Sequence, residues 1–230
     1  MNKRFERIEY LIKPEGLQIL QQSTVAVIGV GGVGGVAAEA LARSGVGTLI
    51  IQDFDVVDIT NINRQIIAND NTIGKVKVDV LANKLQEINP NIKVIKIANK
   101  YGQESKMTLF SHKIDFLIDA IDDIKAKYEL ICNCISHNIN FISSMGAAKK
   151  LSPFNIIIDD IRKTSYDPIA KIIRKKLRDD KITSKVMVAY SKEKPQEIPN
   201  LGSYMPVTAS FGLVCAHYCI MQLLQKGGIK

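Results

Sequence analysis

A glycine-rich stretch that joins a strand-like segment to a helix-like one constrains the fold of this chain more than any other feature. Residues 24–29 (TVAVIG) are apolar and mostly β-branched, and residues 36–45 (VAAEALARSG) place apolar side chains at helical spacing. In such a unit glycine lets the backbone approach a phosphate, and the helix N-terminus offers free N–H groups. The stretch follows the GxGxxG pattern, and its candidate nucleotide contacts are Gly29, Gly31, Gly32 and Gly34.

Strand-like and helix-like segments continue to alternate after this unit. Such alternation predicts an open, mainly parallel sheet covered by helices, which is a Rossmann-like α/β fold. The strand-like segments are residues 48–55, 92–97, 114–120 and 139–144, and the helix-like segments are residues 74–89 and 125–137.

The pattern changes after about residue 145. Two strand-like segments, 154–161 and 185–191, flank a basic helix-like segment at 171–178, and a long apolar helix is expected at 205–225. No repeat or linker rich in Ser or Pro divides the chain, so we expect one domain over residues 1–230. Its parts are a helical arm (1–22), a nucleotide-binding core (23–145) and a substrate-side mixed extension with a closing helix (146–230).

Composition limits where the protein works and what it binds. The 230 residues include 31 Lys or Arg and 23 Asp or Glu, a net charge of +8 that suits a polyanionic partner. The charged start MNKRFERIEY lacks the apolar run of a secretory signal. Four cysteines without paired CxxC motifs suggest buried, reduced thiols, so we expect a cytoplasmic protein. The apolar residues 207–224 include polar side chains that are costly in lipid, which favours a buried helix over a membrane span.

Polar residues follow the second predicted strand and suit a nucleotide with several phosphates. Asp53 lies 19 residues after Gly34, where its carboxylate can accept hydrogen bonds from ribose hydroxyls. The amides and cations beyond it can hold developing negative charge, whereas a nicotinamide site needs a hydride-accepting face. Two alternatives remain open: residues 63–65 (NRQ) could form a solvated turn, and Lys77 could be a surface residue of a helix. The candidate residues are Asp53, Asp55, Asn61, Asn63, Arg64 and Lys77.

Two adjacent acids, Asp122 and Asp123, follow the strand expected at 114–120. Ligands of open parallel sheets bind at the carboxyl ends of the strands. One acid can cap the helix that begins near Lys125 while the other meets a metal ion. Asp122 can face the phosphates, and the sequence leaves open which of the two acids is the cap and which meets the metal.

Five motifs in this order resemble the ATP-dependent activating enzymes, a family that includes ubiquitin-activating enzymes and the ThiF and MoeB adenylyltransferases. The motifs are GVGGVG, DFD, NINRQ, GKVK and DAIDD. The resemblance implies that the glycine loop and Asp53 hold ATP, that Asn61, Arg64 and Lys77 contact its phosphates, and that Asp122 organises Mg²⁺. It also implies a homodimer in which Arg7 is donated to the partner's ATP.

Within this family the chain is most similar to the subgroup that modifies threonylcarbamoyladenosine beside the anticodon of tRNA. The segments RFERIEYLIKPEGLQIL, INPN and DDIRKTSYDPIAKIIRKKLR carry this similarity. It implies that ATP activates the threonyl carboxylate, after which the substrate closes its own ring with net loss of one water. It also implies a partner from a sulfur-acceptor or desulfurase system.

Two other functions remain open at this point. One is adenylylation of the C-terminus of a sulfur-carrier protein, although the zinc knuckles typical of those enzymes and a thioester-forming cysteine are missing. The other is a nicotinamide-dependent oxidoreductase, which the residues Arg64, Lys77 and Asp122 argue against.

A basic segment of the extension is the candidate tRNA surface. Its cations lie on both sides of Asp167 and Pro168, and they can follow an RNA backbone without reading its sequence. A solvated helix face is the alternative. The residues are Arg162, Lys163, Lys171, Arg174, Lys175, Lys176 and Arg178.

Overall fold

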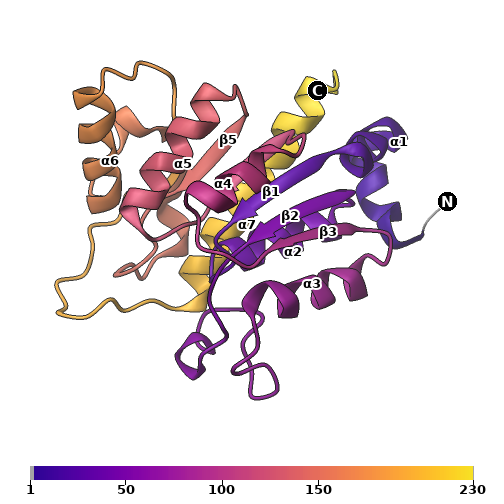
Figure 1. The fold of residues 1–230 in the computed structure, drawn as a ribbon, viewed down its shortest axis with the longest axis horizontal. Coiled ribbons are helices and arrows are strands. Elements are labelled where there is room, and N and C mark those ends of the chain that lie inside the picture. Colours follow the sequence, from indigo (N-terminus) through magenta and orange to yellow (C-terminus); the bar gives the residue numbers. More distant parts are fainter. Residues whose placement is uncertain (1–2, 230) are drawn as a thin grey trace.

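The fold is built on one seven-stranded sheet (Figure 1). This computed structural model describes residues 3–229. Met1, Asn2 and Lys230 lie outside them. The strands are β1 Thr24–Ile28, β2 Thr48–Gln52, β3 Lys93–Ile97, β4 Phe116–Asp119, β5 Phe141–Ser144, β6 Ile156–Asp160 and β7 Met187–Ser191. Their order is β3-β2-β1-β4-β5-β7-β6, and all neighbours are parallel except β6 and β7. The expected α/β fold with a mixed C-terminal extension is confirmed.

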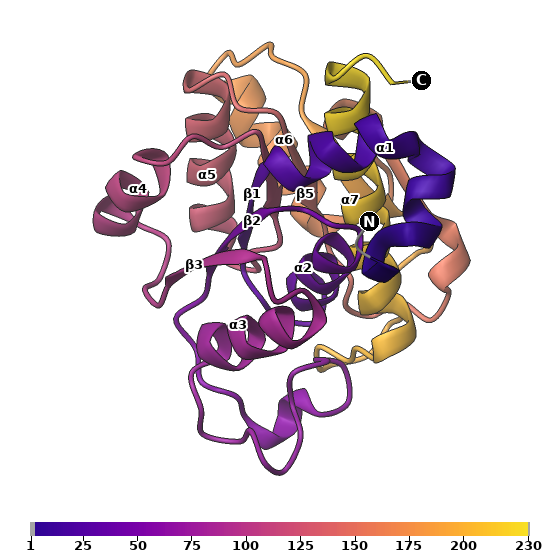
Figure 2. The same ribbon diagram turned by 90° about the vertical axis from the view of Figure 1, so that its right-hand side faces the viewer.

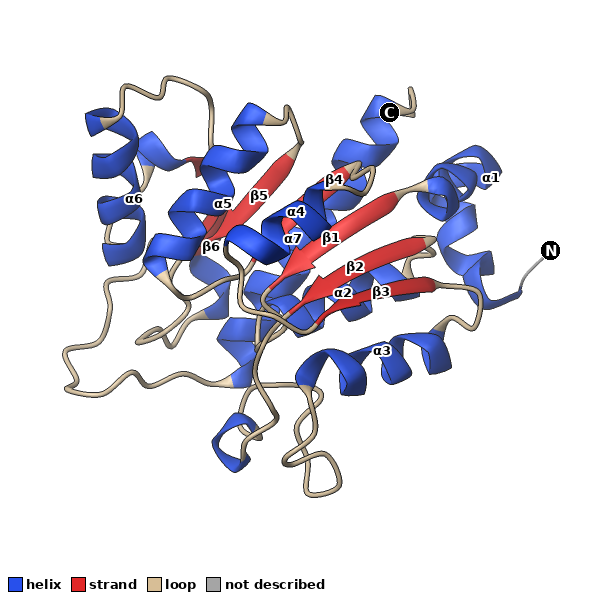
Figure 3. Ribbon diagram, viewed as in Figure 1, coloured by secondary structure: helices blue, strands red, loops and turns tan. Residues whose placement is uncertain are grey.

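Helices cover both faces of this sheet (Figure 2). The helices are α1 Glu6–Gln22, α2 Gly34–Arg43, α3 Lys77–Ile88, α4 Gln103–Phe110, α5 Ile124–Ser136, α6 Pro168–Asp179 and α7 Met205–Lys226. Apolar side chains of α1, α2, α3 and α7 share one core with the sheet, while α4, α5 and α6 pack on the opposite side. Long loops extend beyond the carboxyl ends of the strands (Figure 3).

Glycine is required where β1 turns into α2. Gly29 has φ +85°, and a Cβ at Gly34 would lie 1.8 Å from the carbonyl oxygen of Gly29. Any larger residue at Gly34 would push the start of α2 off the end of β1. The motif therefore places the N-terminus of a helix directly at the carboxyl edge of the sheet.

The closing helix α7 lies in the core as expected. Its buried residues include Val207, Phe211, Cys215 and Cys219, and Gly212 lets it approach α2, where a Cβ would lie 2.4 Å from the Val33 oxygen. Within the described residues it is the one helix that is long and apolar enough to cross a membrane, and half of its most apolar window is buried in the fold.

Three local features differ from the sequence prediction. Helix α3 begins at Lys77 and not at residue 74, because Gly74 has φ +80° and Val76 forms a bridge with Val56. Helix α4 was not expected. Helix α1 is kinked at Lys13, which precedes Pro14 and has φ 64°.

Candidate nucleotide site

The glycine loop and Asp53 are joined by a hydrogen bond at the carboxyl edge. Asp53 follows β2, and its Oδ2 accepts from the Val30 N–H at 2.8 Å while its Oδ1 accepts from the Asp55 N–H at 2.9 Å. A carboxylate has about four acceptor positions, so each oxygen retains a free one for a ribose hydroxyl. The predicted ribose contact therefore lies beside the predicted phosphate loop.

Gly31 is the glycine of this loop that protein packing does not require. A Cβ there would meet nothing closer than the Gln65 amide nitrogen at 3.7 Å, whereas a Cβ at Gly32 would lie 3.0 Å from the Arg64 oxygen. Helix α2 also has no side-chain cap at its N-terminus. An open glycine beside uncapped helical N–H groups is the arrangement that phosphate groups bind.

Gln65 is a further residue at this place that sequence reasoning did not select. It is 7% exposed, and its Oε1 is buried without a hydrogen-bond partner within the described residues. A buried acceptor of this kind is unfavourable unless a ligand or water meets it. Its position in NINRQ, next to Arg64, is the signal that could have identified it.

Lys77 is the first residue of α3, and its ammonium forms an ion pair with Asp55. Its Nζ lies 2.7 Å from Oδ2 of Asp55, and its side chain is 6% exposed against 46% for Asp55. Because an ammonium has three donors, this ion pair leaves two for a phosphate. The structure therefore argues against the alternative that Lys77 is a solvated surface lysine.

The amides of the NINRQ segment hold the segment in place. Asn61 is buried, and its Oδ1 accepts from the Asp58 N–H at 3.2 Å, which caps the 3₁₀ turn Ile59–Asn61. Asn63 donates to the Ser203 oxygen at 2.7 Å and so ties this segment to the loop before α7. Both amides thus hold the NINRQ segment in place, and their predicted contacts with the nucleotide stay predictions.

Arg64 is braced through one nitrogen of its guanidinium. Nη1 donates to the Thr60 oxygen at 2.8 Å and to Oδ1 of Asn63 at 3.0 Å. Within residues 3–229, Nη2 makes no hydrogen bond or ion pair. The guanidinium is thus oriented from one side and retains donors for an anionic ligand.

The two acids after β4 divide the roles that the sequence left open. Asp123 caps α5, since its Oδ1 accepts from the Ala126 N–H at 2.9 Å, and its Oδ2 lies 3.3 Å from the Lys100 Nζ. These hydrogen bonds hold the pKa of Asp123 below its ordinary value. Asp122 is exposed and has no ion pair within the described residues. Asp123 therefore has a structural role, and Asp122 is the acid available to a metal ion.

Mg²⁺ fits this donor set only if the nucleotide helps to hold it. Among residues 3–229 no group of three or more His, Cys, Asp or Glu is arranged to bind a metal. Mg²⁺ in phosphate-transferring sites is commonly held by one or two carboxylates and by the phosphates themselves. A single exposed Asp122 beside a phosphate loop matches that mode.

The buried pair Asp119 and Lys127 was missed at the sequence level. The Nζ of Lys127 lies 2.8 Å from Oδ2 of Asp119, and neither side chain is more than 1% exposed. Helical spacing to the buried Leu130, Ile131 and Cys134 could have indicated that Lys127 is buried, but no local signal indicates its partner Asp119.

Arg7 lies far from the other candidate residues of its own chain. It is exposed near the start of α1, beside Phe5, which packs near Gly45 after α2. Helix α1 leads into the first residue of β1, whereas the glycine loop follows the last one. The structure thus separates Arg7 from its own glycine loop by the length of the strands.

The basic segment separates into cations that hold the protein's own backbone and cations that make no such hydrogen bond within the described residues. Arg162 donates to the Thr183 and Ser184 oxygens, and Arg174 donates to Thr164 Oγ1 at 2.6 Å. These two guanidinium groups brace the backbone around α6. The remaining predicted cations are exposed, with Lys163 and Arg178 near acids and Lys176 over the Tyr128 ring. They are Lys163, Lys171, Lys175, Lys176 and Arg178.

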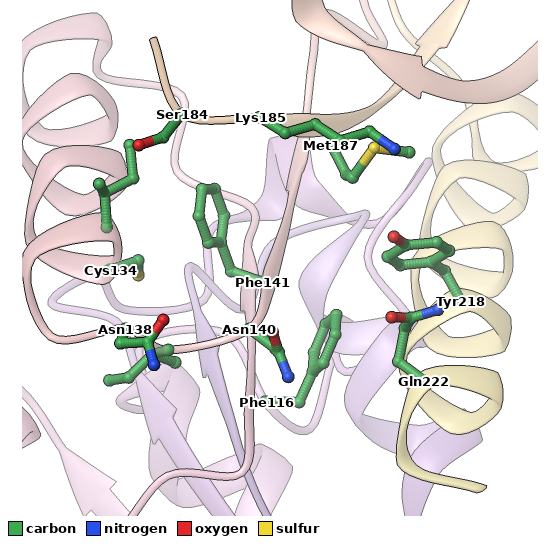
Figure 4. Close-up of a pocket in the computed structure, with 12 residues that line it drawn as sticks. Phe116, Cys134, Asn138, Asn140, Phe141, Ser184, Lys185, Met187, Tyr218 and Gln222 are labelled. Carbon is green, nitrogen blue, oxygen red and sulfur yellow. The ribbon is translucent and has the colours of Figure 1, made fainter. Parts of the chain in front are cut away.

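A cavity of about 230 Å³ lies elsewhere in the molecule (Figure 4). Its lining includes Phe116, Asn140, Phe141 and Met187, which lie at or just before the starts of β4, β5 and β7, together with Tyr218 of α7. The glycine loop lies at the opposite ends of the parallel strands. The cavity is therefore separate from the candidate nucleotide site.

The fold and this edge define an ATP-dependent activating enzyme of the ThiF type. The chain matches the ThiF family over residues 6–230 and belongs to that family. This match confirms the resemblance drawn from the five motifs.

Particular relatives narrow the comparison. The chain is 42% identical to tRNA threonylcarbamoyladenosine dehydratase of Bacillus subtilis (strain 168), covering 100% of this chain and 98% of that protein. Crystal structures of Escherichia coli tRNA N6-threonylcarbamoyladenosine dehydratase with ATP and with AMP each give a TM-score of 0.94 at 32% identity, covering 98% of this chain and 96% of theirs. Molybdopterin-synthase adenylyltransferase of E. coli (strain K12) is 31% identical over 60% of this chain and 54% of its own length.

Proposed function

We propose that this chain is an ATP-dependent tRNA threonylcarbamoyladenosine dehydratase. The observation that carries the proposal is the 42% identity to the B. subtilis enzyme over both full lengths. The match to the molybdopterin-synthase adenylyltransferase covers only 60% of the chain, which favours this function over activation of a sulfur-carrier protein. The glycine loop, Asp53, Arg64 and Asp122 supply the groups that the reaction needs.

The first chemical step makes a leaving group from the threonyl carboxylate. One carboxylate oxygen attacks a phosphorus of ATP, which releases pyrophosphate if the α-phosphorus reacts and ADP if the γ-phosphorus reacts. The relationship to adenylyltransferases favours the α-phosphorus. Arg64 and Lys77 offset the negative charge that develops on the phosphate oxygens, and Asp53 holds the ribose.

The second step closes the ring without an enzyme nucleophile. A nitrogen or oxygen of the substrate's own carbamoyl group attacks the activated carbonyl, and AMP departs with the former carboxylate oxygen. The attack is intramolecular, so its effective concentration is high. The thiols agree with this mechanism, since burial raises the pKa of Cys215 to about 12 and raises those of Cys134 and Cys219 as well.

We propose Mg²⁺ as the cofactor and Asp122 as its protein ligand. The ion would supply charge neutralisation at the phosphates. What supports this assignment is that Asp122 is exposed and unpaired within the described residues, two residues after Ala120, whose oxygen lies 2.7 Å from the place of a Cβ on Gly29.

We also propose a homodimer that completes each ATP site with Arg7 of the other chain. The position of Arg7 on α1, at the far ends of the strands from its own glycine loop, supports a role in a second copy. The tRNA would lie along Lys171, Lys175 and Arg178 of α6. A cytoplasmic location agrees with the four free thiols, and a sulfur-acceptor partner rests on the sequence resemblance alone.

One experiment tests the reaction directly. The protein is mixed with ATP, Mg²⁺ and tRNA from cells that lack the cyclic modification. The tRNA is then digested to nucleosides, and their masses are measured by mass spectrometry. We expect the loss of one water from threonylcarbamoyladenosine, with AMP formed in equal amount. Formation of AMP with a sulfur-carrier protein and not with tRNA would contradict the proposal, and formation of ADP would correct the route.

A further inference from the structure

Two charged side chains lie buried directly below the loop that carries Asp122. Lys127 in α5 and Asp119 at the end of β4 form an ion pair with an N–O distance of 2.8 Å, and their side chains are 1% and 0% exposed. Apolar residues of similar size often stabilise a fold as well as a buried ion pair does, so stability is a weak reason for such a pair. Neither residue takes part in the two proposed chemical steps.

The pair joins three elements at the carboxyl edge. Besides Asp119, the Lys127 ammonium donates to the Ser144 oxygen at 2.9 Å and to Ser143 Oγ at 3.3 Å, and both serines end β5. Ser143 Oγ in turn donates to Oδ2 of Asp119 at 2.5 Å. Strand β4, strand β5 and helix α5 are thus held together by one network in which all three ammonium donors are used.

The other oxygen of Asp119 holds the acidic loop. Its Oδ1 accepts from the Ile121 N–H at 3.0 Å, and Asp122 is the next residue. On the other side, the Ala120 N–H donates to the Ile28 oxygen at 2.8 Å, and the Ala120 oxygen is the atom nearest to the place of a Cβ on Gly29, at 2.7 Å. The backbone before Asp122 is therefore fixed between the buried pair and the glycine loop.

We propose that Lys127 and Asp119 are a positioning pair that aims the Asp122 carboxylate at the Mg²⁺ of bound ATP. This inference rests on the proposed role of Asp122 and extends it to two residues that are buried away from any ligand. Lys127 holds the Asp119 carboxylate in one orientation through the ion pair, and Asp119 passes this constraint to the loop through its hydrogen bond with the Ile121 N–H. Loss of the pair frees the loop without removing a group that touches ATP.

The test measures ATP binding to the full-length protein by isothermal titration calorimetry, with Mg²⁺ and with EDTA. The ratio of the two dissociation constants reports how well the site uses the metal. The variants are Lys127→Met, the conservative Lys127→Arg, and the doubly neutral Asp119→Leu with Lys127→Met, which leaves no unpaired buried charge. Lys96→Met is the matched control, because it removes a 2.6 Å ion pair with Asp79 that is half-exposed.

The Mg²⁺ effect is the dissociation constant in EDTA divided by that in Mg²⁺. We expect this ratio to fall at least about fivefold in Lys127→Met and in the double variant, while the dissociation constant in EDTA stays within about twofold of wild type. Lys127→Arg and Lys96→Met should keep the full effect. A role in stability alone would lower the melting temperature and leave the ratio unchanged, and that result overturns the proposal. If Lys127→Met fails to fold, the same ratio measured on the double variant tests the proposal.

The same assay separates this inference from the function on which it rests. Asp122→Asn should abolish the Mg²⁺ effect with an intact Lys127. If Asp122→Asn leaves the ratio unchanged, the proposed metal site is wrong. If Asp122→Asn removes the effect and the Lys127 variants do not, only the positioning role fails.

Discussion

The Asp123 carboxylate accepts a hydrogen bond from the Ala126 N–H at 2.9 Å and so caps helix α5. The adjacent Asp122 makes no such bond and is exposed. Two neighbouring acids thus have different tasks, because the helix begins at Ile124 and only the residue before it can reach the free N–H groups of the first turn.

This difference predicts opposite outcomes for two matched variants. Asp122→Asn should keep the melting temperature and lose most ATP-dependent turnover. Asp123→Asn should keep turnover, and any change should be in stability, within about 1 kcal/mol because Asn is itself a good cap. Calorimetric unfolding and nucleoside mass analysis measure the two effects. Wild-type turnover in Asp122→Asn would remove this residue from the mechanism.

Arg64→Ala should slow the reaction strongly, because its guanidinium is oriented by Thr60 and Asn63 and retains free donors. Loss of a preorganised group that stabilises transition-state charge raises a barrier by about 2–4 kcal/mol. Single-turnover rates with saturating ATP give this value. A change below about twofold would make Arg64 a brace of the NINRQ turn and nothing more.

The exposed cations of α6 should contribute to tRNA affinity and its salt dependence. Replacing Lys171, Lys175 and Arg178 together by Ala removes up to three phosphate contacts, and the slope of log affinity against log salt should fall by about two to three. ATP affinity should not change. Filter binding at several salt concentrations measures the slope, and an unchanged slope would place the tRNA elsewhere.

Arg174→Ala is the control for that surface. Its guanidinium holds Thr164 and the Ile161 carbonyl, so its loss should lower the melting temperature. Its salt slope should remain that of wild type.

Mixing two inactive variants tests whether Arg7 acts in the other chain. Arg7→Ala and Asp122→Asn chains, unfolded and refolded together, should recover about a quarter of wild-type turnover, because half of the dimers are mixed and each has one intact site. Either variant alone should stay inactive. If the mixture is no more active than its parts, Arg7 does not complete a partner's site.

The cysteines should react with iodoacetamide in an order set by burial. At pH 8 the native protein should be alkylated at the half-buried Cys132 first, and slowly, because burial raises the pKa of that thiol. The more deeply buried Cys134, Cys215 and Cys219 should react only after unfolding. Peptide mass spectrometry identifies the sites. Rapid native labelling of a buried cysteine would contradict both the packing and the absence of a thiol nucleophile.

The sequence by itself indicated every strand of the sheet, every helix except α4, and the edge at which a nucleotide is expected to bind. Glycines at 29 and 34 allow the tight strand-to-helix turn, and alternating strand-like and helix-like segments favour a covered parallel sheet. Asp53 and Asp122 follow strands and Lys77 begins a helix, so local pattern was enough to place these three near that edge.

Only the tertiary structure decided which of these residues are free to meet a ligand. Hydrogen bonds between separate segments cannot be read from local spacing, and they set Arg174 as a brace and Asn63 as a tie to Ser203. Lys127 shows the same limit most clearly. Its charge suggests a surface position, yet its partner Asp119 comes from another element, and the burial of both depends on how β4, β5 and α5 pack together.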